Sequence, residues 1–90
     1  KAKMVCFEWH EEDFNSVIKT VDHLESLDYK DYGVIGYFEE PLPPIITYSK
    51  QGDPYLEIPA SFHSKNEIMR ALEKLVNPER RTHFGMFYVK

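Results

Sequence analysis

The chain has one cysteine, few glycines and no long apolar run, and each of these shortages excludes a class of protein. Cys6 is the single cysteine, so no internal disulfide can form and an oxidising compartment is not implied. The four glycines are scattered at positions 33, 36, 52 and 85, and none lies in a phosphate-binding loop. No apolar stretch approaches the ~20 residues that a membrane-spanning helix needs, and no signal peptide is visible. We therefore expect a cytoplasmic protein that does not enter the membrane.

The motifs of catalysis and metal binding are missing as well. Neither an H-x-x-x-H spacing nor a cysteine pair accompanies the four histidines, at positions 10, 23, 63 and 83. Cys6 lies within a predicted strand, where a small buried hydrophobe is its usual role. No serine stands in a G-x-S-x-G setting. We expect no catalytic residue, no metal and no cofactor, so the chain is predicted not to be an enzyme. A small enzyme with an unrecognised site is the alternative that these patterns leave open.

The composition is that of an ordinary folded domain. Ninety residues are too few for two hydrophobic cores, so we expect one domain over residues 1–90. The chain is 42% hydrophobic and 14% aromatic, which is too apolar for a disordered tail. A chain of this size buries roughly 60–65% of its unfolded surface, enough to fold without disulfides or metals.

Two segments have the apolar spacing of amphipathic helices. The first should end near residue 27 or 28, and its buried stripe should consist of Phe14, Val17, Ile18, Val21 and Leu24. The acids at 11–13 precede it and suit the positive end of the helix dipole. The second helix begins at Ser64 with Glu67 three residues later, which is the spacing of a capping box, and it stops before Asn77-Pro78. Its buried stripe should consist of Ile68, Leu72, Leu75 and Val76.

Five segments have the β-branched and aromatic character of strands, namely residues 4–9, 33–39, 45–49, 54–58 and 82–89. The order β-α-β-β-β-α-β predicts an α+β fold. We expect one mostly antiparallel sheet of four to five strands with two helices on one face, as in ferredoxin-like or related two-layer sandwiches. The first and last strands should lie inside the sheet. The three middle strands should form an antiparallel meander, with the prolines at 41, 43 and 44 making a stiff link.

The charges are distributed unevenly along the chain. Residues 1–40 have ten acids and four bases, a net charge of −6, whereas residues 64–90 have six bases and three acids, a net charge of +3. If the two halves occupy different surfaces, an acidic face suits a basic protein partner. If they interleave in the fold, the asymmetry averages out. Function is inferred by elimination to be that of a protein–protein interaction or regulatory module, with an acidic inhibitor or adaptor acting on a basic partner surface as one form of it.

The expected protein contacts are the acidic start of the first helix and the proline-rich link. They comprise Glu11, Glu12, Asp13, Glu39, Glu40 and Pro41. An edge strand that stays unpaired could also add a strand from a partner or from a second copy, which would give a homodimer.

An RNA-binding domain is the alternative from another class. The bases that could hold phosphates are Lys65, Arg70, Lys74, Arg80 and Arg81. Aromatic residues at 30–37 and 84–87 resemble the RNA-recognition signature, and aromatic rings on an open sheet face can stack bases. The glutamates at 67, 73 and 79 could neutralise the five bases by helix-spaced pairing. In the aromatic segments, Asp31 stands where the RNA-recognition signature has glycine. Core packing is therefore the favoured meaning of those aromatic segments.

Overall fold

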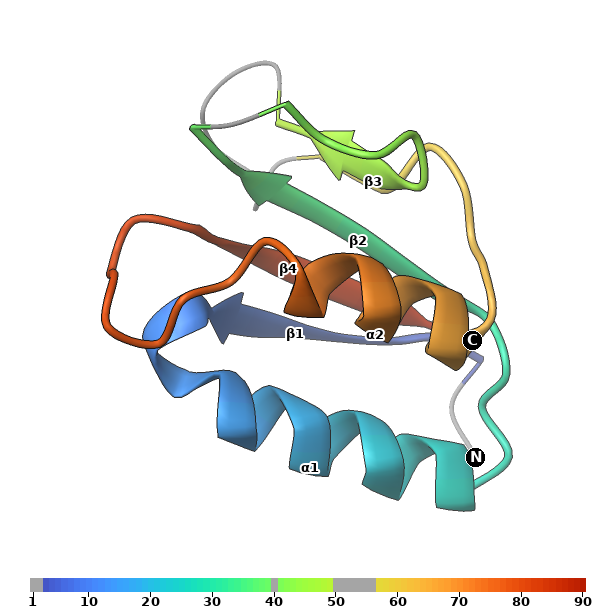
Figure 1. Cartoon of the computed structure of the whole chain (residues 1–90). Helices are drawn as coiled ribbons and strands as arrows, with labels where there is room; N and C mark the ends of the chain where they lie inside the picture. The colour runs from blue at the N-terminus through green and yellow to red at the C-terminus, as the bar shows by residue number, and fades with distance from the viewer. Residues whose placement is uncertain (1–2, 40, 50–56) are drawn as a thin grey trace.

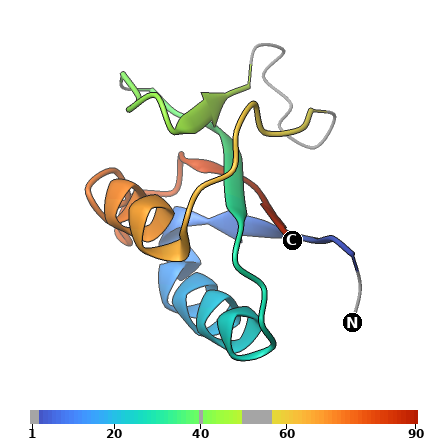
Figure 2. The ribbon, with the colours of Figure 1, turned by 90° about the vertical axis from the view of Figure 1, so that its right-hand side faces the viewer.

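The structure is a computed structural model that describes residues 3–39, 41–49 and 57–90. A four-stranded mixed sheet has two helices on one of its faces (Figure 1). The strands are β1 (Val5–His10), β2 (Tyr32–Tyr37), β3 (Ile46–Tyr48) and β4 (Phe84–Val89). The helices are α1 (Phe14–Ser26) and α2 (Lys65–Glu73), and the short 3-10 turn η1 (Glu11–Asp13) leads into α1. Seen from the side, both helices lie on the same side of the strands (Figure 2). The predicted α+β two-layer architecture is confirmed.

The strands are arranged in the order β1-β4-β2-β3, which corrects one part of the prediction. The last strand is inside the sheet as expected, but the first strand is at its edge. β4 is antiparallel to both β1 and β2, so those two strands run parallel to each other. The crossover through α1 thus leaves a space between them that β4 fills. Cys6 on β1 is exposed rather than buried, because it lies on the face of the strand opposite to Trp9 and the core.

The middle of the sheet also differs from the predicted antiparallel meander. β3 pairs with β2 in parallel, with Ile46 opposite Val34. After β2 the chain runs back and then reverses again at a turn, where the Ile46 N–H donates to the Pro43 carbonyl over 3.1 Å (Figure 1). Proline has a fixed φ and no N–H to donate, so this segment returns as an extended link instead of a hairpin. The strand predicted at 54–58 lies mostly outside the described residues, and residues 57 and 58 belong to no strand.

Both predicted helical stripes face the sheet. Phe14, Val17, Val21 and Leu24 of α1 are buried, as are Ile68 and Leu72 of α2. The other three predicted members, Ile18, Leu75 and Val76, are half-buried and pack against the same core. The capping box is confirmed as well: the Glu67 N–H donates to Ser64 Oγ and the Ser64 N–H donates to Glu67 Oε1, each over 3.3 Å. Hydrogen bonds from Ser64 lower the pKa of the Glu67 carboxyl.

Two glycines on neighbouring strands make room for the single tryptophan. Gly85 on β4 pairs with Trp9 on one side and with Gly36 on the other. A Cβ on Gly36 would lie 2.9 Å from Trp9 Cζ2, and a Cβ on Gly85 would lie 2.9 Å from Trp9 Nε1. The Gly85 Cβ would also clash with the Ile35 carbonyl oxygen. The indole therefore lies over bare backbone, and Trp9 is 1% exposed.

Gly85→Ala should destabilise the fold by about 2–3 kcal/mol or more, because the new methyl group must push β2 away from β4 or displace the indole. Urea denaturation followed by Trp9 fluorescence measures this. A midpoint equal to that of the wild type would contradict the close approach of the two strands.

Ser64→Ala should cost about 0.5–2 kcal/mol, because the Glu67 N–H loses its acceptor at the start of α2. Ser26→Ala is the matched control: its hydroxyl donates to the His23 carbonyl at the end of α1 and caps no N–H. The control should stay within about 0.5 kcal/mol of the wild type. Equal losses in the two variants would count against the capping box.

Candidate functional site

Three aromatic rings form a row on the sheet face that points away from the helices, which we call the outer face. His10 pairs with Phe84, and Phe84 pairs with Tyr37, so three neighbouring strands place these residues at one level. The ring centroids of His10 and Phe84 are 6.1 Å apart, and those of Tyr37 and Phe84 are 5.8 Å apart. The interplanar angles are 19° and 25°, so both pairs are stacked. We call this set the aromatic row.

Strand alternation explains why the aromatic row faces outward. Trp9, the residue before His10, points toward the helices, and Gly85, the residue after Phe84, pairs with Trp9. Because neighbouring residues of a strand alternate between the two faces, His10 and Phe84 point the other way. At the start of β2 the outer face is covered, because Pro59 packs against Gly33. The aromatic row lies at the opposite end of that strand. The His10 side chain is 45% exposed, and Phe84 and Tyr37 are half-buried.

Two carboxylates flank the β1 end of the aromatic row. Glu8 precedes His10 by two residues on the same face of β1, and its Oε2 lies 3.1 Å from His10 Nε2. Glu12 Oε1 lies 3.8 Å from His10 Nδ1 on the other side of the ring. Exposed carboxylates at the edge of an aromatic row favour a positively charged ligand, because their negative charges attract a cation.

Glu11, predicted to contact a protein partner, is in the interior, which corrects that assignment. Its carboxylate accepts hydrogen bonds from the backbone N–H groups of Asn77, Thr82 and His83 over 3.0–3.1 Å. Arg80 Nε lies 3.0 Å from Glu11 Oε1 and donates a further hydrogen bond. Burial by itself would raise the pKa of Glu11, but the hydrogen bonds from Arg80 and the three N–H groups outweigh it and lower the pKa to about 2. With no exposed surface, Glu11 is unavailable to a partner.

The remaining predicted protein contacts do not form one patch with Glu11. Glu12, Asp13, Glu39 and Pro41 are exposed, and Glu40 lies outside the described residues. Asp13 accepts a hydrogen bond from Ser16 Oγ over 2.8 Å at the start of α1. The Glu39 N–H donates to His83 Nε2 over 3.3 Å. Glu39 comes two residues after Tyr37, which ends the aromatic row. A role in protein contact stays a prediction for these exposed residues.

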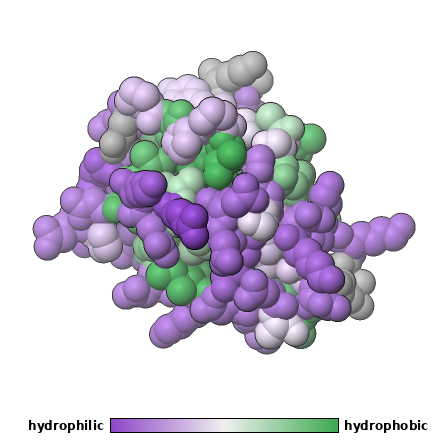
Figure 3. All heavy atoms as spheres, turned by 45° about the vertical axis from the view of Figure 1, so that its right-hand side comes forward, coloured by the Kyte–Doolittle hydropathy of each residue, from purple (hydrophilic) through white to green (hydrophobic). Residues whose placement is uncertain are grey.

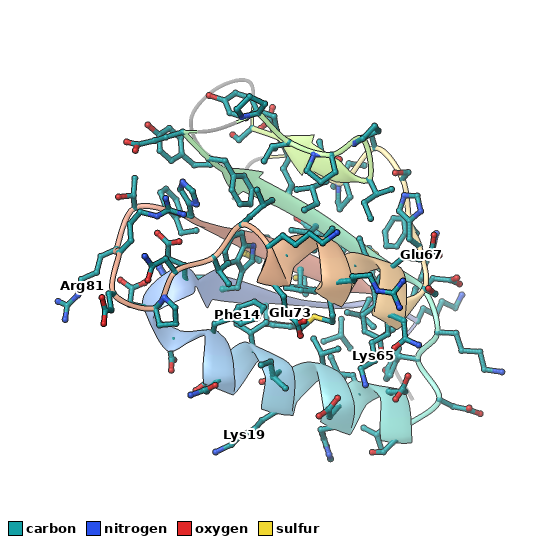
Figure 4. All side chains as sticks on the ribbon, viewed as in Figure 1. Phe14, Lys19, Lys65, Glu67, Glu73 and Arg81 are labelled. Atoms are coloured by element: carbon teal, nitrogen blue, oxygen red, sulfur yellow. The ribbon has the colours of Figure 1, made fainter. Side chains whose placement is uncertain are left out.

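The five bases predicted for RNA binding are not gathered into one stripe. Lys65 Nζ lies 2.6 Å from Asp22 and 3.1 Å from Glu25 of α1, and the hydrogen bonds to these two acids raise the pKa of Lys65. Arg80 is paired with Glu11. Lys65 lies between the two helices, whereas Arg81 projects at the far end of the molecule (Figure 4). Among the described residues, Arg70, Lys74 and Arg81 have no ion-pair partner.

Other chemistry has less support. Within residues 3–39, 41–49 and 57–90, no group of three His, Cys, Asp or Glu side chains could hold a metal ion. Ser61 Oγ lies 2.8 Å from His63 Nε2, the contact that an activated nucleophile requires. Neither residue is in the lining of the hollow beside α2, nor of the hollows beside Tyr29 and beside Phe7. The described helices also include none that is long and apolar enough to span a membrane.

Sequence reasoning missed the aromatic row and Glu8. The sequence patterns bear on His10 only as a metal ligand, and on the aromatic residues at 37 and 84 only as core or RNA-binding positions. The available signal was their outward parity within three strands. That signal identifies a row only when the pairing of the strands is known, and pairing is not a local property of the sequence.

Glu11→Gln should destabilise the domain by about 3 kcal/mol or more at neutral pH, because Arg80 and three N–H groups lose a charged acceptor. Glu12→Gln is the neighbouring control and should stay within about 0.5 kcal/mol, since Glu12 is exposed. Denaturation midpoints of the two variants decide the matter. Equal effects would contradict the buried position of Glu11.

The pH dependence gives a second measure of the same group. The folded-state pKa of Glu11 is about 2 and its ordinary value is 4.5, so its contribution is fully present above about pH 4.5 and is lost as the pH falls toward 2. The wild type should lose roughly 3 kcal/mol more than Glu11→Gln over this range. Parallel pH profiles of the two proteins would contradict the lowered pKa.

Comparison with known proteins gives no family for this chain. No protein-family model, no curated protein and no solved structure matches it. What the domain does must therefore be inferred from the geometry of its own residues.

Proposed function

We propose that this domain is a non-catalytic protein-interaction module that binds a basic segment of a partner on the aromatic row and the carboxylates of Glu8 and Glu12. The observation that supports this function is the stack of three rings, with His10 flanked by two carboxylates on an exposed sheet face. The proposed acidic surface is therefore on the outer face beside β1, and not at the start of the first helix as expected from the sequence.

An arginine side chain of the partner fits this surface well. A guanidinium can stack on an aromatic ring while its N–H groups donate to a nearby carboxylate. Such a contact contributes about 0.5–1 kcal/mol at an exposed site and more when the cation is desolvated. Several arginines or lysines along an extended segment would let neighbouring side chains reach both the rings and the two acids.

The position of β1 adds a second means of binding. β1 pairs with β4, and within the described residues no other strand pairs with its second edge. An extended partner segment could form backbone hydrogen bonds with this edge. Its alternate side chains would then lie beside Cys6, Glu8 and His10 on the outer face. Pairing of two copies through β1 is the alternative use of the same edge.

RNA binding is less well supported by the same geometry. Bases could stack on the aromatic row, but their phosphates would then lie near Glu8 and Glu12, which repel them. Two of the five candidate bases are already paired with acids. We include a regulatory role and a cytoplasmic location in the proposal; an exposed free cysteine is common in reducing compartments.

The charge contribution can be tested with a fluorescein-labelled peptide of alternating arginine and serine. Glu8→Lys/Glu12→Lys should weaken its binding about tenfold or more, chiefly through slower association. Asp31→Lys/Glu73→Lys introduces the same change of charge at two exposed positions away from the aromatic row and serves as the control. Fluorescence anisotropy at several salt concentrations measures the binding. Equal weakening in both variants would show that only net charge matters and would contradict the proposed surface.

The ring contribution needs a separate variant. Phe84→Leu keeps an apolar side chain at the centre of the row but removes the ring against which His10 and Tyr37 stack. The loss of this support should weaken binding of the arginine peptide by about 0.5–2 kcal/mol. A peptide with citrulline in place of arginine has the same shape without the charge and should bind poorly to all variants. Equal binding of the arginine and citrulline peptides would exclude the cation-binding role.

A further inference from the structure

A groove lies on the helix side of the molecule, between α2 and the segment that precedes β3. It has a volume of about 460 Å³. Its apolar lining consists of Pro43 and Ile45 on one side and Ala71 and Leu75 on the other. All four residues are half-buried, so part of each side chain faces the groove. The proline-rich link between β2 and β3 thus lies beside α2 and forms one wall of this groove.

The groove is an exposed extension of the core. Ile45, Ala71 and Leu75 pack against the buried cluster that includes Ile68 and Leu72. Apolar side chains can be seen between polar ones when the molecule is turned to bring this side forward (Figure 3). A hollow of this volume falls in the range of about 300–1,000 Å³ that is typical of ligand sites, and apolar walls favour large apolar side chains as its contents.

The charged residues of the groove are not equivalent. Arg70 and Lys74 are one helical turn apart, and both are exposed. Among the described residues neither has an ion-pair partner. Glu67, the third charged residue of the lining, is held by the capping hydrogen bonds of Ser64. Glu73 points from α2 toward α1 (Figure 4). The helix-spaced pairing that would have neutralised these two bases is therefore not formed.

We propose that this groove is a second docking site, which takes an acidic segment of a partner protein with large apolar side chains. The apolar side chains would occupy the space over Ile45 and Ala71, and aspartates or glutamates would reach Arg70 and Lys74. The positive charges of Arg70 and Lys74 favour an acidic partner. The apolar lining favours a protein over a nucleic acid, because the charged phosphate backbone makes no apolar contacts.

The groove and the aromatic row lie on opposite faces of the sheet and favour opposite charges. α2 covers the helix-facing side, whereas the aromatic row lies on the outer face. The domain would then connect a basic segment on one face to an acidic segment on the other, as an adaptor does. The groove proposal stands independently of the aromatic row, because no residue is shared between them.

The test uses a short fluorescein-labelled peptide of leucine pairs alternating with glutamate pairs, and a matched peptide with glutamine in place of glutamate. Arg70→Glu/Lys74→Glu should weaken binding of the glutamate peptide by about tenfold or more. Lys19→Glu/Arg81→Glu is the matched control, with the same change of charge at two exposed bases far from the groove (Figure 4). Its affinity should stay within about twofold of the wild type.

Amide chemical shifts of the ¹⁵N-labelled domain locate the binding site. Addition of the glutamate peptide should move the signals of Ile45, Ala71 and Leu75. Saturable binding with these shifts, weaker for the glutamine peptide and lost in Arg70→Glu/Lys74→Glu, would support the proposal. The proposal would be overturned by no saturable binding, by shifts confined to other residues, or by equal weakening in the control. Binding of single-stranded RNA that depends on Arg70 and Lys74, without peptide binding, would also overturn it.

The two proposals can fail separately. Glu8→Lys/Glu12→Lys should bind the glutamate peptide as well as the wild type, because the aromatic row is not part of the groove. Arg70→Glu/Lys74→Glu should likewise keep its affinity for the arginine peptide. Loss of both activities in either variant would contradict the separation of the two sites, and circular dichroism of each variant establishes that it is folded.

Discussion

The buried carboxylate of Glu11 holds together the parts of the chain on which the sheet depends. It accepts hydrogen bonds from three backbone N–H groups and from Arg80, all in the segment between α2 and β4. The Glu11 N–H in turn donates to the His83 carbonyl over 3.1 Å. Because His10 precedes Glu11 and Phe84 follows His83, these bonds fix the start of β4 opposite the end of β1. The aromatic row has its spacing for the same reason. A desolvated charge that is fully hydrogen-bonded thus supports both the fold and the candidate site.

Local features could be predicted from the sequence, whereas long-range pairing could not. The two helical stripes and the capping box depend on residues within a few positions of one another, and each is present as expected. The parallel pairing of β3 and the edge position of β1 depend on which strands meet, and several arrangements bury the same side chains. The burial of Glu11 illustrates the limit: three adjacent acids at a helix start look alike until the segment around Arg80 folds over the first of them.

The charge asymmetry of the sequence survives in the structure only in part. Lys65 joins the two helices through Asp22 and Glu25, and Arg80 neutralises Glu11, so oppositely charged halves of the chain interleave at these points. Other charged residues determine the character of the surface. Glu8 and Glu12 remain beside β1 on the outer face, and Arg70 and Lys74 remain on α2. Net charge alone would have described neither surface, because it also counts residues whose charges are paired within the fold.

The central position of β4 has a consequence for how the domain is made. Every residue of β1 from Val5 to His10 pairs with β4, and so does every residue of β2. During synthesis on the ribosome, β1 and β2 cannot form their pairs with β4 until the region around Val89 has emerged. α1 can form early because its contacts are local, but the sheet cannot close before translation of this region is complete. In the interval the edges of two hydrophobic strands are unprotected, so a nascent chain stalled before β4 is the form of this protein most prone to aggregate.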